Sequence, residues 1–375
     1  MSDNNTSEEN AAQGLAGQVA QWIRPDVQKF SAYHVPDATG FVKLDAMENP
    51  YPWPPSLQDD WLDCLRNADI NRYPDPAARQ LKQALRDELG ISNRFDVLLG
   101  NGSDELIQML AMAVAQPGRV VLAPEPGFVM YQMIATMAGM DYIGVPLKQD
   151  FNLDDGAMLE VINNKQPALV FLAYPNNPTG NLFDKDVIKA VIEAAPGLVI
   201  VDEAYHAFAG DSLIDWLEKY DNLLLMRTVS KMGLAGLRLG YLVGDPQWLS
   251  QLDKTRLPYN INTLTQLSAR FALKHFEVFK AQTQQICEDR EKLYGALCKL
   301  EQAQVFPSRA NFILFRIHGV PSQTIFDALK EQGILIKNLG NKPGLLKDCL
   351  RVTVGTQPEN EQFIEALRGI VQHTG

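Results

Sequence analysis

The sequence of 375 residues holds few of the side chains that build metal centres or disulfide frameworks, with four cysteines and five histidines. No two cysteines have a CxxC spacing, and no two histidines have an HxxxH spacing. The sequence therefore predicts neither a metal site nor a disulfide framework, and we expect scattered reduced thiols.

Positive charge is also scarce, because 34 lysines and arginines face 45 acidic residues and the net charge is −11. Such a chain lacks the basic surface on which general nucleic-acid binding depends, so any anionic ligand must be held by a few local arginines. No apolar run reaches the length of a membrane span, and the first residues lack the basic and apolar regions of a signal peptide. We expect a cytoplasmic protein in which residues 1–18 form a disordered tail.

An alternating pattern of helices and short apolar runs is present from Tyr73 onward. Runs such as "ALVFLAYPNNPTG" and "LVIVDEAYHAF" open with continuous, branched apolar residues, which is typical of strands covered by helices on both faces. The pattern predicts an α/β domain with a mainly parallel sheet over residues 55–262. Long helices and short strands then predict a smaller α+β domain over residues 263–375, joined by the N-terminal arm, residues 19–54.

Polar side chains follow three of these apolar runs at the point where each run ends. Asn177 follows the first, Asp202 ends "LVIV", and Ser230 and Lys231 follow "NLLLMRTV". Ligands of open α/β sheets bind beyond the carboxyl ends of the strands, so these residues predict one shared site.

The residue types at this edge suit one cofactor, pyridoxal 5'-phosphate. A lysine in a cleft loses hydration, which favours the neutral amine that forms a Schiff base with an aldehyde. Asp202 could pair with the protonated ring nitrogen that makes this cofactor an electron sink, or it could simply cap a helix. Tyr205 and Asn177 could both donate to the phenolic oxygen of the ring.

The segments "GNGSDE" and "GLAGLRLG" suit the phosphate of such a cofactor. Gly102 lets the backbone come close, and the helix start at Ser103 and Asp104 presents free N–H groups to an anion. Arg238 can form a charged fork with the phosphate, and Ser230 is a further candidate contact.

Taken together, "SKMGLAGLRLGY", "VDEAY", "YPNNPTG" and "GNGSDE" resemble the class I/II aminotransferases of fold type I, over about residues 40 to 360. The resemblance implies that pyridoxal phosphate is attached to Lys231, which also moves the substrate proton, with Asp202 and Tyr205 as the other catalytic residues. It implies that Phe128, where this family often has a tyrosine, stacks on the ring. It also implies a homodimer with shared active sites, in which Tyr73 reaches the cofactor phosphate of the partner.

A narrower set of segments, "LDAMENPYPWPP", "NRYPDP", "NFILFR" and "LRVTVGT", resembles the histidinol-phosphate aminotransferases. That resemblance implies amino transfer between histidinol phosphate and 2-oxoglutarate in histidine biosynthesis. It implies that Arg351 holds the substrate anion, because an arginine fork suits both phosphate and carboxylate, with a surface arginine at a strand edge as the alternative. Arg316 and Tyr33 are further substrate-binding candidates, each with a plain structural role as the alternative, and Asn177 and Tyr73 also border the substrate.

Two kinds of alternative function stay open. An aromatic-amino-acid aminotransferase or a threonine-phosphate decarboxylase would share the fold and most of the motifs. A non-catalytic DNA-binding regulator on this fold would need a basic segment, and the first 40 residues hold Arg24 and Lys29 as their only lysine or arginine.

Overall fold

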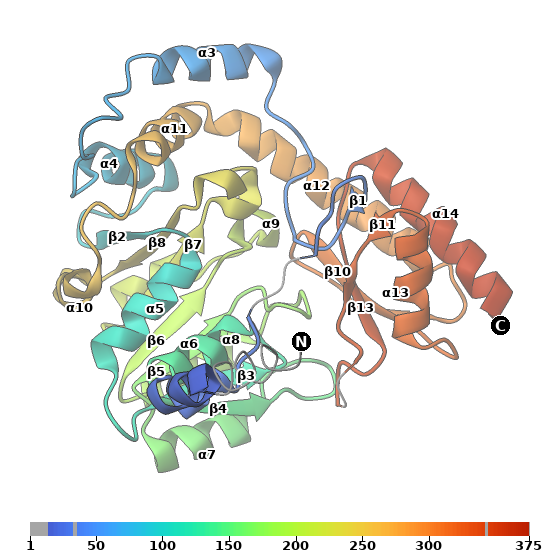
Figure 1. Ribbon diagram of the computed structural model, residues 1–375, viewed down its shortest axis with the longest axis horizontal. Coiled ribbons are helices and arrows are strands. Elements are labelled where there is room, and N and C mark those ends of the chain that lie inside the picture. The colour runs from blue at the N-terminus through green and yellow to red at the C-terminus, as the bar shows by residue number, and fades with distance from the viewer. Residues whose placement is uncertain (1–13, 33–35, 342–343, 375) are drawn as a thin grey trace, which may run out of the picture.

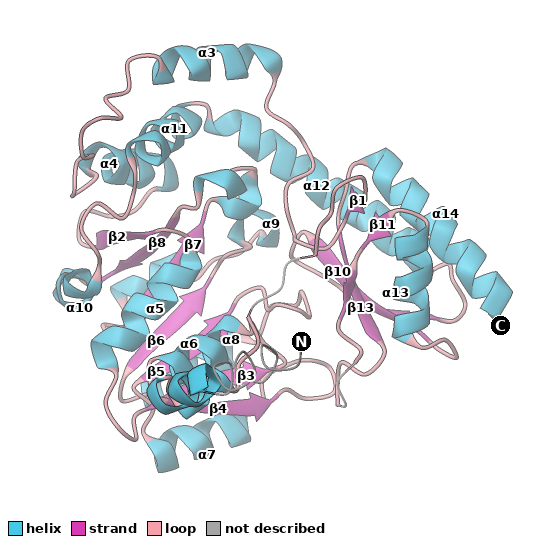
Figure 2. Ribbon diagram, viewed as in Figure 1, coloured by secondary structure: helices cyan, strands magenta, loops and turns pink. Residues whose placement is uncertain are grey.

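The computed structural model describes residues 14–32, 36–341 and 344–374, and its largest element is a seven-stranded sheet (Figures 1 and 2). The strand order is β2-β8-β7-β6-β5-β3-β4. The strands are β2 (Asp96–Gly100), β3 (Val120–Glu125), β4 (Asp141–Pro146), β5 (Leu169–Ala173), β6 (Leu198–Asp202), β7 (Leu223–Thr228) and β8 (Gly240–Gly244). Strand β8 runs antiparallel to its neighbours β2 and β7, whereas the other pairs are parallel. The predicted mainly parallel α/β sheet is confirmed.

Helices cover both faces of this sheet, which explains the uninterrupted apolar runs of its strands. Along β6, Leu198 and Ile200 belong to one hydrophobic cluster, while Val199 and Val201 belong to another on the opposite face. The first cluster lies under α5 (Ser103–Val114), α6 (Met130–Met137) and α10 (Pro246–Leu252). The second lies under α3 (Pro55–Leu65), α4 (Arg79–Leu89), α7 (Asp155–Lys165), α8 (Lys185–Ala194) and α11 (Thr263–Lys274).

A smaller antiparallel sheet, in the order β12-β13-β10-β9, lies to the right in Figure 1. Its strands are β9 (Ala303–Val305), β10 (Phe312–Ile317), β12 (Lys337–Asn338) and β13 (Cys349–Thr353). Beside it, β1 (Val42–Lys43) of the N-terminal arm pairs with β11 (Ile334–Leu335). The helices of this part are α12 (Phe276–Leu297), α13 (Ser322–Glu331) and α14 (Gln357–Thr374).

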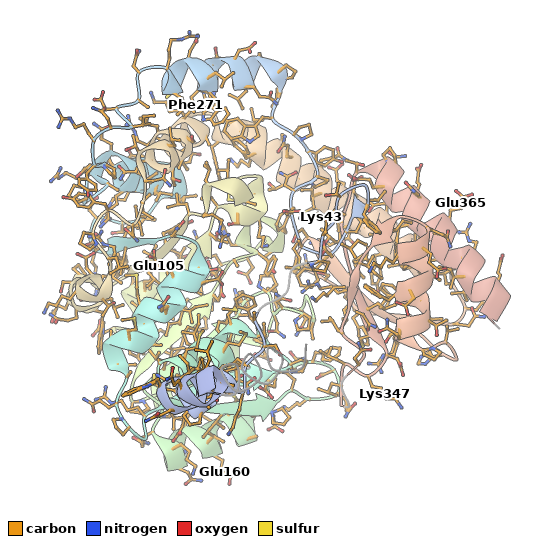
Figure 3. All side chains as sticks on the ribbon, in the orientation of Figure 1. Lys43, Glu105, Glu160, Phe271, Lys347 and Glu365 are labelled. Carbon is orange, nitrogen blue, oxygen red and sulfur yellow. The ribbon has the colours of Figure 1, made fainter. Side chains whose placement is uncertain are left out.

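Helices α11 and α12 connect the two parts, and the division that we predict at residue 262 remains a prediction. Helix α11 packs on α3 and α4, and its Phe271, labelled in Figure 3, stacks on Trp53 at 6.1 Å between ring centroids. Helix α12 carries Phe279 in the core of the large sheet and Ile286 in the core of the small one.

Short helices complete the described chain. They are α2 (Pro25–Gln28), α9 (His206–Ala209), η1 (Ile214–Glu218), η2 (Ser230–Met232), η3 (Ala235–Leu237) and η4 (Asp253–Thr255). Residues 14–22 are helical as well, and this range includes the last part of the predicted tail, residues 14–18. The first part of that tail, residues 1–13, lies outside the described residues. Within the described ranges, no helix is long and apolar enough to cross a membrane.

Candidate active site

A cavity of about 110 Å³ lies where β5, β6 and β7 end. It brings together most of the residues that the sequence singled out. Its lining consists of Met47, Ser103, Asp104, Phe128, Ala173, Pro175, Asn177, Asp202, Ala204, Tyr205, Thr228, Ser230, Lys231 and Arg238. The polar residues therefore meet at one edge of the sheet, as the sequence predicted.

Lys231 lies in the short helix η2, directly after β7. Its Nζ donates to the carbonyl oxygen of Ala46 at 3.2 Å. Burial lowers the pKa of Lys231 to about 8, and the nearby guanidinium of Arg351 acts in the same direction. An amine with this pKa is partly neutral near pH 7, which both nucleophilic attack and proton transfer require.

Asp202 is the last residue of β6, and its side chain is bonded to a tyrosine that the sequence analysis missed. The hydroxyl of Tyr131 donates to Oδ2 at 2.7 Å, and the N–H of Ala204 donates to Oδ1 at 3.1 Å. Burial raises the pKa of Asp202 to about 6, although both hydrogen bonds oppose the rise. Tyr131 follows Phe128 by one helical turn, and the two rings meet edge to face at 5.5 Å. The three-residue spacing from Phe128 was the sequence feature from which Tyr131 could have been predicted.

Asn177 joins two further predicted residues. Its Nδ2 donates to the hydroxyl oxygen of Tyr205 at 3.2 Å, and its Oδ1 accepts from Nη1 of Arg351 at 2.6 Å. Burial raises the pKa of Tyr205, so its hydroxyl keeps its proton and can donate it in a hydrogen bond. The large sheet and the small sheet thus meet in one hydrogen-bonded chain, in which Arg351 does not line the cavity but bonds to Asn177, which does.

Two glycines lie at the end of the cavity that is predicted to hold the cofactor phosphate. A Cβ on Gly102, whose φ is +87°, would lie 2.6 Å from Nη2 of Arg238. A Cβ on Gly240 would lie 2.7 Å from the backbone nitrogen of Ser103. Only glycine therefore lets the start of α5 approach β8 and the arginine so closely. Arg238 is half-exposed and lies 3.4 Å from Oδ2 of Asp104.

The hydroxyl groups of Ser230 and Thr228 lie near the predicted phosphate site. Ser230 lines the cavity, and its Oγ lies 2.9 Å from Oγ1 of Thr228, which also accepts from the Ser230 N–H at 3.1 Å. Thr228, the last residue of β7, was not among the predicted site residues. Both hydroxyls belong to residues that precede Lys231, so the end of β7 fixes Lys231 and Ser230 together.

Two predicted residues are placed elsewhere, and a third is not described. Arg316 does not line the cavity; its Nη2 donates to the carbonyl of Leu345 at 2.9 Å, and its guanidinium lies over the ring of Phe306. Tyr73 is 80% exposed and stacks on Tyr259. Tyr33 lies outside the described residues.

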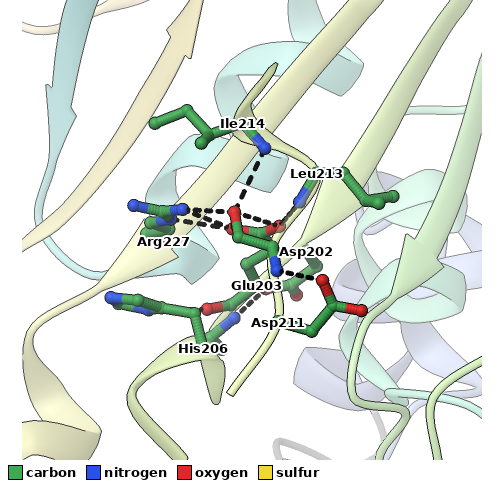
Figure 4. Close-up of polar contacts among 9 residues, drawn as sticks. Asp202, Glu203, His206, Asp211, Leu213, Ile214 and Arg227 are labelled. Carbon is green, nitrogen blue, oxygen red and sulfur yellow. Dashed lines mark hydrogen bonds and ion pairs between the residues drawn. The ribbon is translucent and has the colours of Figure 1, made fainter. Parts of the chain in front are cut away.

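Behind the cavity, the residue after Asp202 enters a buried polar network, shown in Figure 4. Glu203 is fully buried and forms an ion pair of 2.7 Å with Arg227 of β7. Its carboxylate also accepts from the hydroxyl of Ser212 and from the N–H of Leu213. This network ties the end of β6, strand β7 and the loop of Ser212 and Leu213 together in the interior.

The residues of the cavity fit pyridoxal 5'-phosphate. The amine that could bind its aldehyde, the carboxylate that could face its ring nitrogen and the donors for its phenolic oxygen lie around one space. At the far end, the glycine-lined helix start and Arg238 offer N–H groups and positive charge to its phosphate. Fold and site together define a pyridoxal-phosphate-dependent enzyme of fold type I.

Comparisons with known proteins agree with this class. The family model "Aminotransferase class I and II" matches residues 39–367. Histidinol-phosphate aminotransferase 2 of Nitrosococcus oceani is 58% identical, over 93% of this chain and 97% of that protein. The histidinol-phosphate aminotransferase of Chromobacterium violaceum is 50% identical, over 93% and 98%. The chain belongs to the class I and II aminotransferases, among the histidinol-phosphate aminotransferases.

Solved structures confirm the fold. The crystal structure of histidinol-phosphate aminotransferase from Sinorhizobium meliloti in complex with pyridoxal-5'-phosphate matches with a TM-score of 0.84 and 25% identity, over 94% of this chain and 98% of that one. The enzyme therefore uses pyridoxal 5'-phosphate, as the sequence predicted.

Proposed function

We propose that the protein transfers the amino group of histidinol phosphate to 2-oxoglutarate, giving imidazole acetol phosphate and glutamate in histidine biosynthesis. The observation that carries this proposal is the bond from Arg351 to Asn177, which sets a buried guanidinium beside the cavity. A planar, permanently charged fork can hold a phosphate in one half of the reaction and a carboxylate in the other. The names of relatives at 50–58% identity support this choice of substrate.

When bound, pyridoxal 5'-phosphate supplies an aldehyde for the substrate amine and a ring that accepts the electron pair released at the α-carbon. Lys231 moves the proton at that carbon, because its amine is partly neutral near pH 7. Asp202 holds a negative charge toward the ring nitrogen, and Tyr131 orients it. Tyr205 and Asn177 orient the phenolic oxygen.

The phosphate of the cofactor is held, in this proposal, by the start of α5 and by side chains around it. Gly102, Ser103 and Asp104 offer backbone N–H groups, while Ser230 and Arg238 offer side-chain donors. The ion pair with Arg238 gives the carboxylate of Asp104 a second role, which is to orient the guanidinium. Phe128, which lines the cavity, supplies the ring that stacks on the cofactor.

The protein acts, we propose, as a cytoplasmic homodimer with shared active sites. Exposed apolar side chains on two segments that meet through the stacked rings of Tyr73 and Tyr259 support this assembly: Ile70 is 76% exposed, Tyr73 80% and Leu257 71%. Large exposed apolar surfaces often mark the place where a partner binds. Tyr73 would then reach the cofactor phosphate of the partner subunit. Arg316 and Tyr33 stay in the proposal as substrate contacts.

A substrate panel on the purified, cofactor-loaded protein tests the proposal. We expect the largest kcat/KM with histidinol phosphate, compared with phenylalanine and threonine phosphate. A larger value with phenylalanine, or release of carbon dioxide from threonine phosphate, would assign the site to one of the alternatives.

Arg351→Ala should raise KM for both substrates about 100-fold, since charge-assisted forks contribute a few kcal/mol. An unchanged KM for 2-oxoglutarate would contradict the role of Arg351.

A further inference from the structure

The backbone from Asp45 to Met47, called the 45–47 segment below, crosses from the small sheet to the cavity. On one side, the carbonyl of Leu44 accepts from the N–H of Thr353 in β13 at 2.8 Å. On the other side, the side chain of Asn49 donates to the carbonyl of Met232 at 3.2 Å. The segment therefore spans the distance between a strand of the small sheet and the short helix that carries the catalytic lysine.

The backbone of this segment is held in a conformation that methionine disfavours. Met47 has a φ of +53°, in the left-handed region, where a side chain with a Cβ costs about 1–2 kcal/mol. Two buried side chains hold it there. Oγ1 of Thr353 accepts the Met47 N–H at 3.0 Å, and Nδ2 of Asn311 donates to the Met47 carbonyl at 2.9 Å. A strained residue persists where its surroundings fix it from both sides, and such residues cluster at functional sites.

The two carbonyl groups before Met47 contact both cations of the site. The carbonyl oxygen of Asp45 accepts from Nη2 of Arg351 at 3.0 Å. The carbonyl oxygen of Ala46 accepts from Nζ of Lys231 at 3.2 Å. Because a buried cation needs hydrogen-bond acceptors, the direction of these carbonyls determines where both side chains point.

We propose that Thr353 is a positioning residue for the reaction and acts through the backbone of Met47. Its hydroxyl fixes the 45–47 segment, so that the segment holds the guanidinium of Arg351 in line with the cavity. Thr353 itself does not line the cavity. The inference rests on the proposed function, in which Arg351 binds the substrate anion.

Three variants distinguish a positioning role of Thr353 from a purely structural role. Thr353→Val removes the hydroxyl but keeps the shape and the backbone hydrogen bond to Leu44. Thr353→Ser keeps the hydroxyl. Thr283→Val is the matched control, because Thr283 is also buried, on α12, and its hydroxyl donates to the carbonyl of Lys280 away from the cavity.

Two measurements on the holoenzyme test the proposal. The first is KM and kcat for 2-oxoglutarate. We expect Thr353→Val to raise KM about 10-fold, the size expected when a buried N–H loses its acceptor, with a smaller change in kcat. Thr353→Ser should stay within about 2-fold of the wild type, since its hydroxyl restores the bond. Thr283→Val should leave KM unchanged.

The second measurement does not depend on turnover. Succinate, a dicarboxylate without a reactive carbonyl, should raise the unfolding temperature of the wild-type holoenzyme, because a ligand that binds only the native state stabilises it. The rise should shrink in Thr353→Val and persist in Thr353→Ser and Thr283→Val. If histidinol phosphate is not the amino donor, the substrate panel fails while this comparison still reports on Thr353. Wild-type KM and a full succinate response in Thr353→Val would overturn the inference, as would equal losses in Thr283→Val.

Discussion

Asp202 and Glu203 are consecutive buried carboxylates at the end of β6, and they face opposite sides of the chain. Asp202 faces the cavity, where Tyr131 and Ala204 donate to it and, among the described residues, no cation forms an ion pair with it. Glu203 faces the interior and is paired with Arg227. A buried charge is costly unless it is neutralised.

The two sides therefore have different tasks. On the interior side, Arg227 neutralises the carboxylate of Glu203, and this ion pair holds β6 and β7 together. In the proposed function, the carboxylate of Asp202 on the cavity side pairs instead with the protonated ring nitrogen of the cofactor. We expect substitutions on the cavity side to change chemistry and leave stability nearly intact, and substitutions on the interior side to do the reverse.

The largest effect on the cavity side is expected from Lys231→Ala. In the proposed function the amine of Lys231 binds the cofactor and moves the proton, so turnover should fall about 10⁴-fold or more without it. The visible absorption band of the bound cofactor should change, while the unfolding temperature of the cofactor-free protein stays close to the wild type. Lys254→Ala, at an exposed position, is the control. Transamination at the wild-type rate in Lys231→Ala would disprove the assignment of this residue.

Asp202→Asn should have the next largest effect, because it keeps the shape of the side chain, removes its charge and leaves only one of its two polar atoms able to accept from Tyr131 or Ala204. We expect cofactor binding to persist and kcat to fall about 10³-fold, similar to the loss of one preorganised group that stabilises developing charge. Single-turnover measurements of α-proton removal would locate the loss in that step. A normal rate would show that no countercharge to the ring is needed.

Glu203→Gln tests the interior side. It leaves the Arg227 guanidinium buried without its counter-charge, which costs about 3–5 kcal/mol of unfolding free energy. Denaturant unfolding measures this loss, and activity per folded molecule should change little. Glu218→Gln is the control, since its ion pair with Arg94 is exposed and should contribute less than about 1 kcal/mol. A large loss of kcat in Glu203→Gln without a loss of stability would remove the distinction between the two sides.

The sequence predicted the cavity side well because strand ends are local features. Apolar runs and the residues that follow them can be found without knowing which elements meet. The sheet class and the gathering of Asn177, Asp202 and Lys231 follow from that pattern alone. The roles of individual residues, by contrast, rest on residue type and on the family resemblance, and they stay predictions.

Contacts between distant segments could not be predicted in the same way. Tyr131 lies 71 positions before Asp202, and nothing in either segment indicates their hydrogen bond. The left-handed backbone of Met47 depends on side chains that arrive from the end of the chain. Arg227 did leave a signal, because a charged residue inside the apolar run "NLLLMRTV" indicates a buried ion pair.

The smallest predicted effect concerns His206, which lies on the interior side beside the Glu203 carbonyl. Burial lowers the pKa of His206 to about 3, and the charge of Arg227 acts in the same direction. An unfolded histidine takes up its proton near pH 6.5, whereas the folded one stays neutral, so the unfolded state binds more protons as the pH falls below about 6.5. Stability should then decrease by up to about 1.4 kcal/mol per pH unit, or about 2 kcal/mol between pH 6.5 and 5.

The raised pKa of Asp202 has the opposite effect on stability. Between about pH 6 and the ordinary pKa of aspartate, the folded protein holds a proton on Asp202 that the unfolded chain does not, so stability rises as the pH falls. Comparison of the wild type with His206→Asn cancels that contribution, since Asp202 is present in both. We expect the difference in unfolding free energy between the two proteins to shrink as the pH falls from 6.5 to 5. Parallel curves over that range would mean that His206 is protonated in the folded protein, and that the interior side tolerates a second cation beside Arg227.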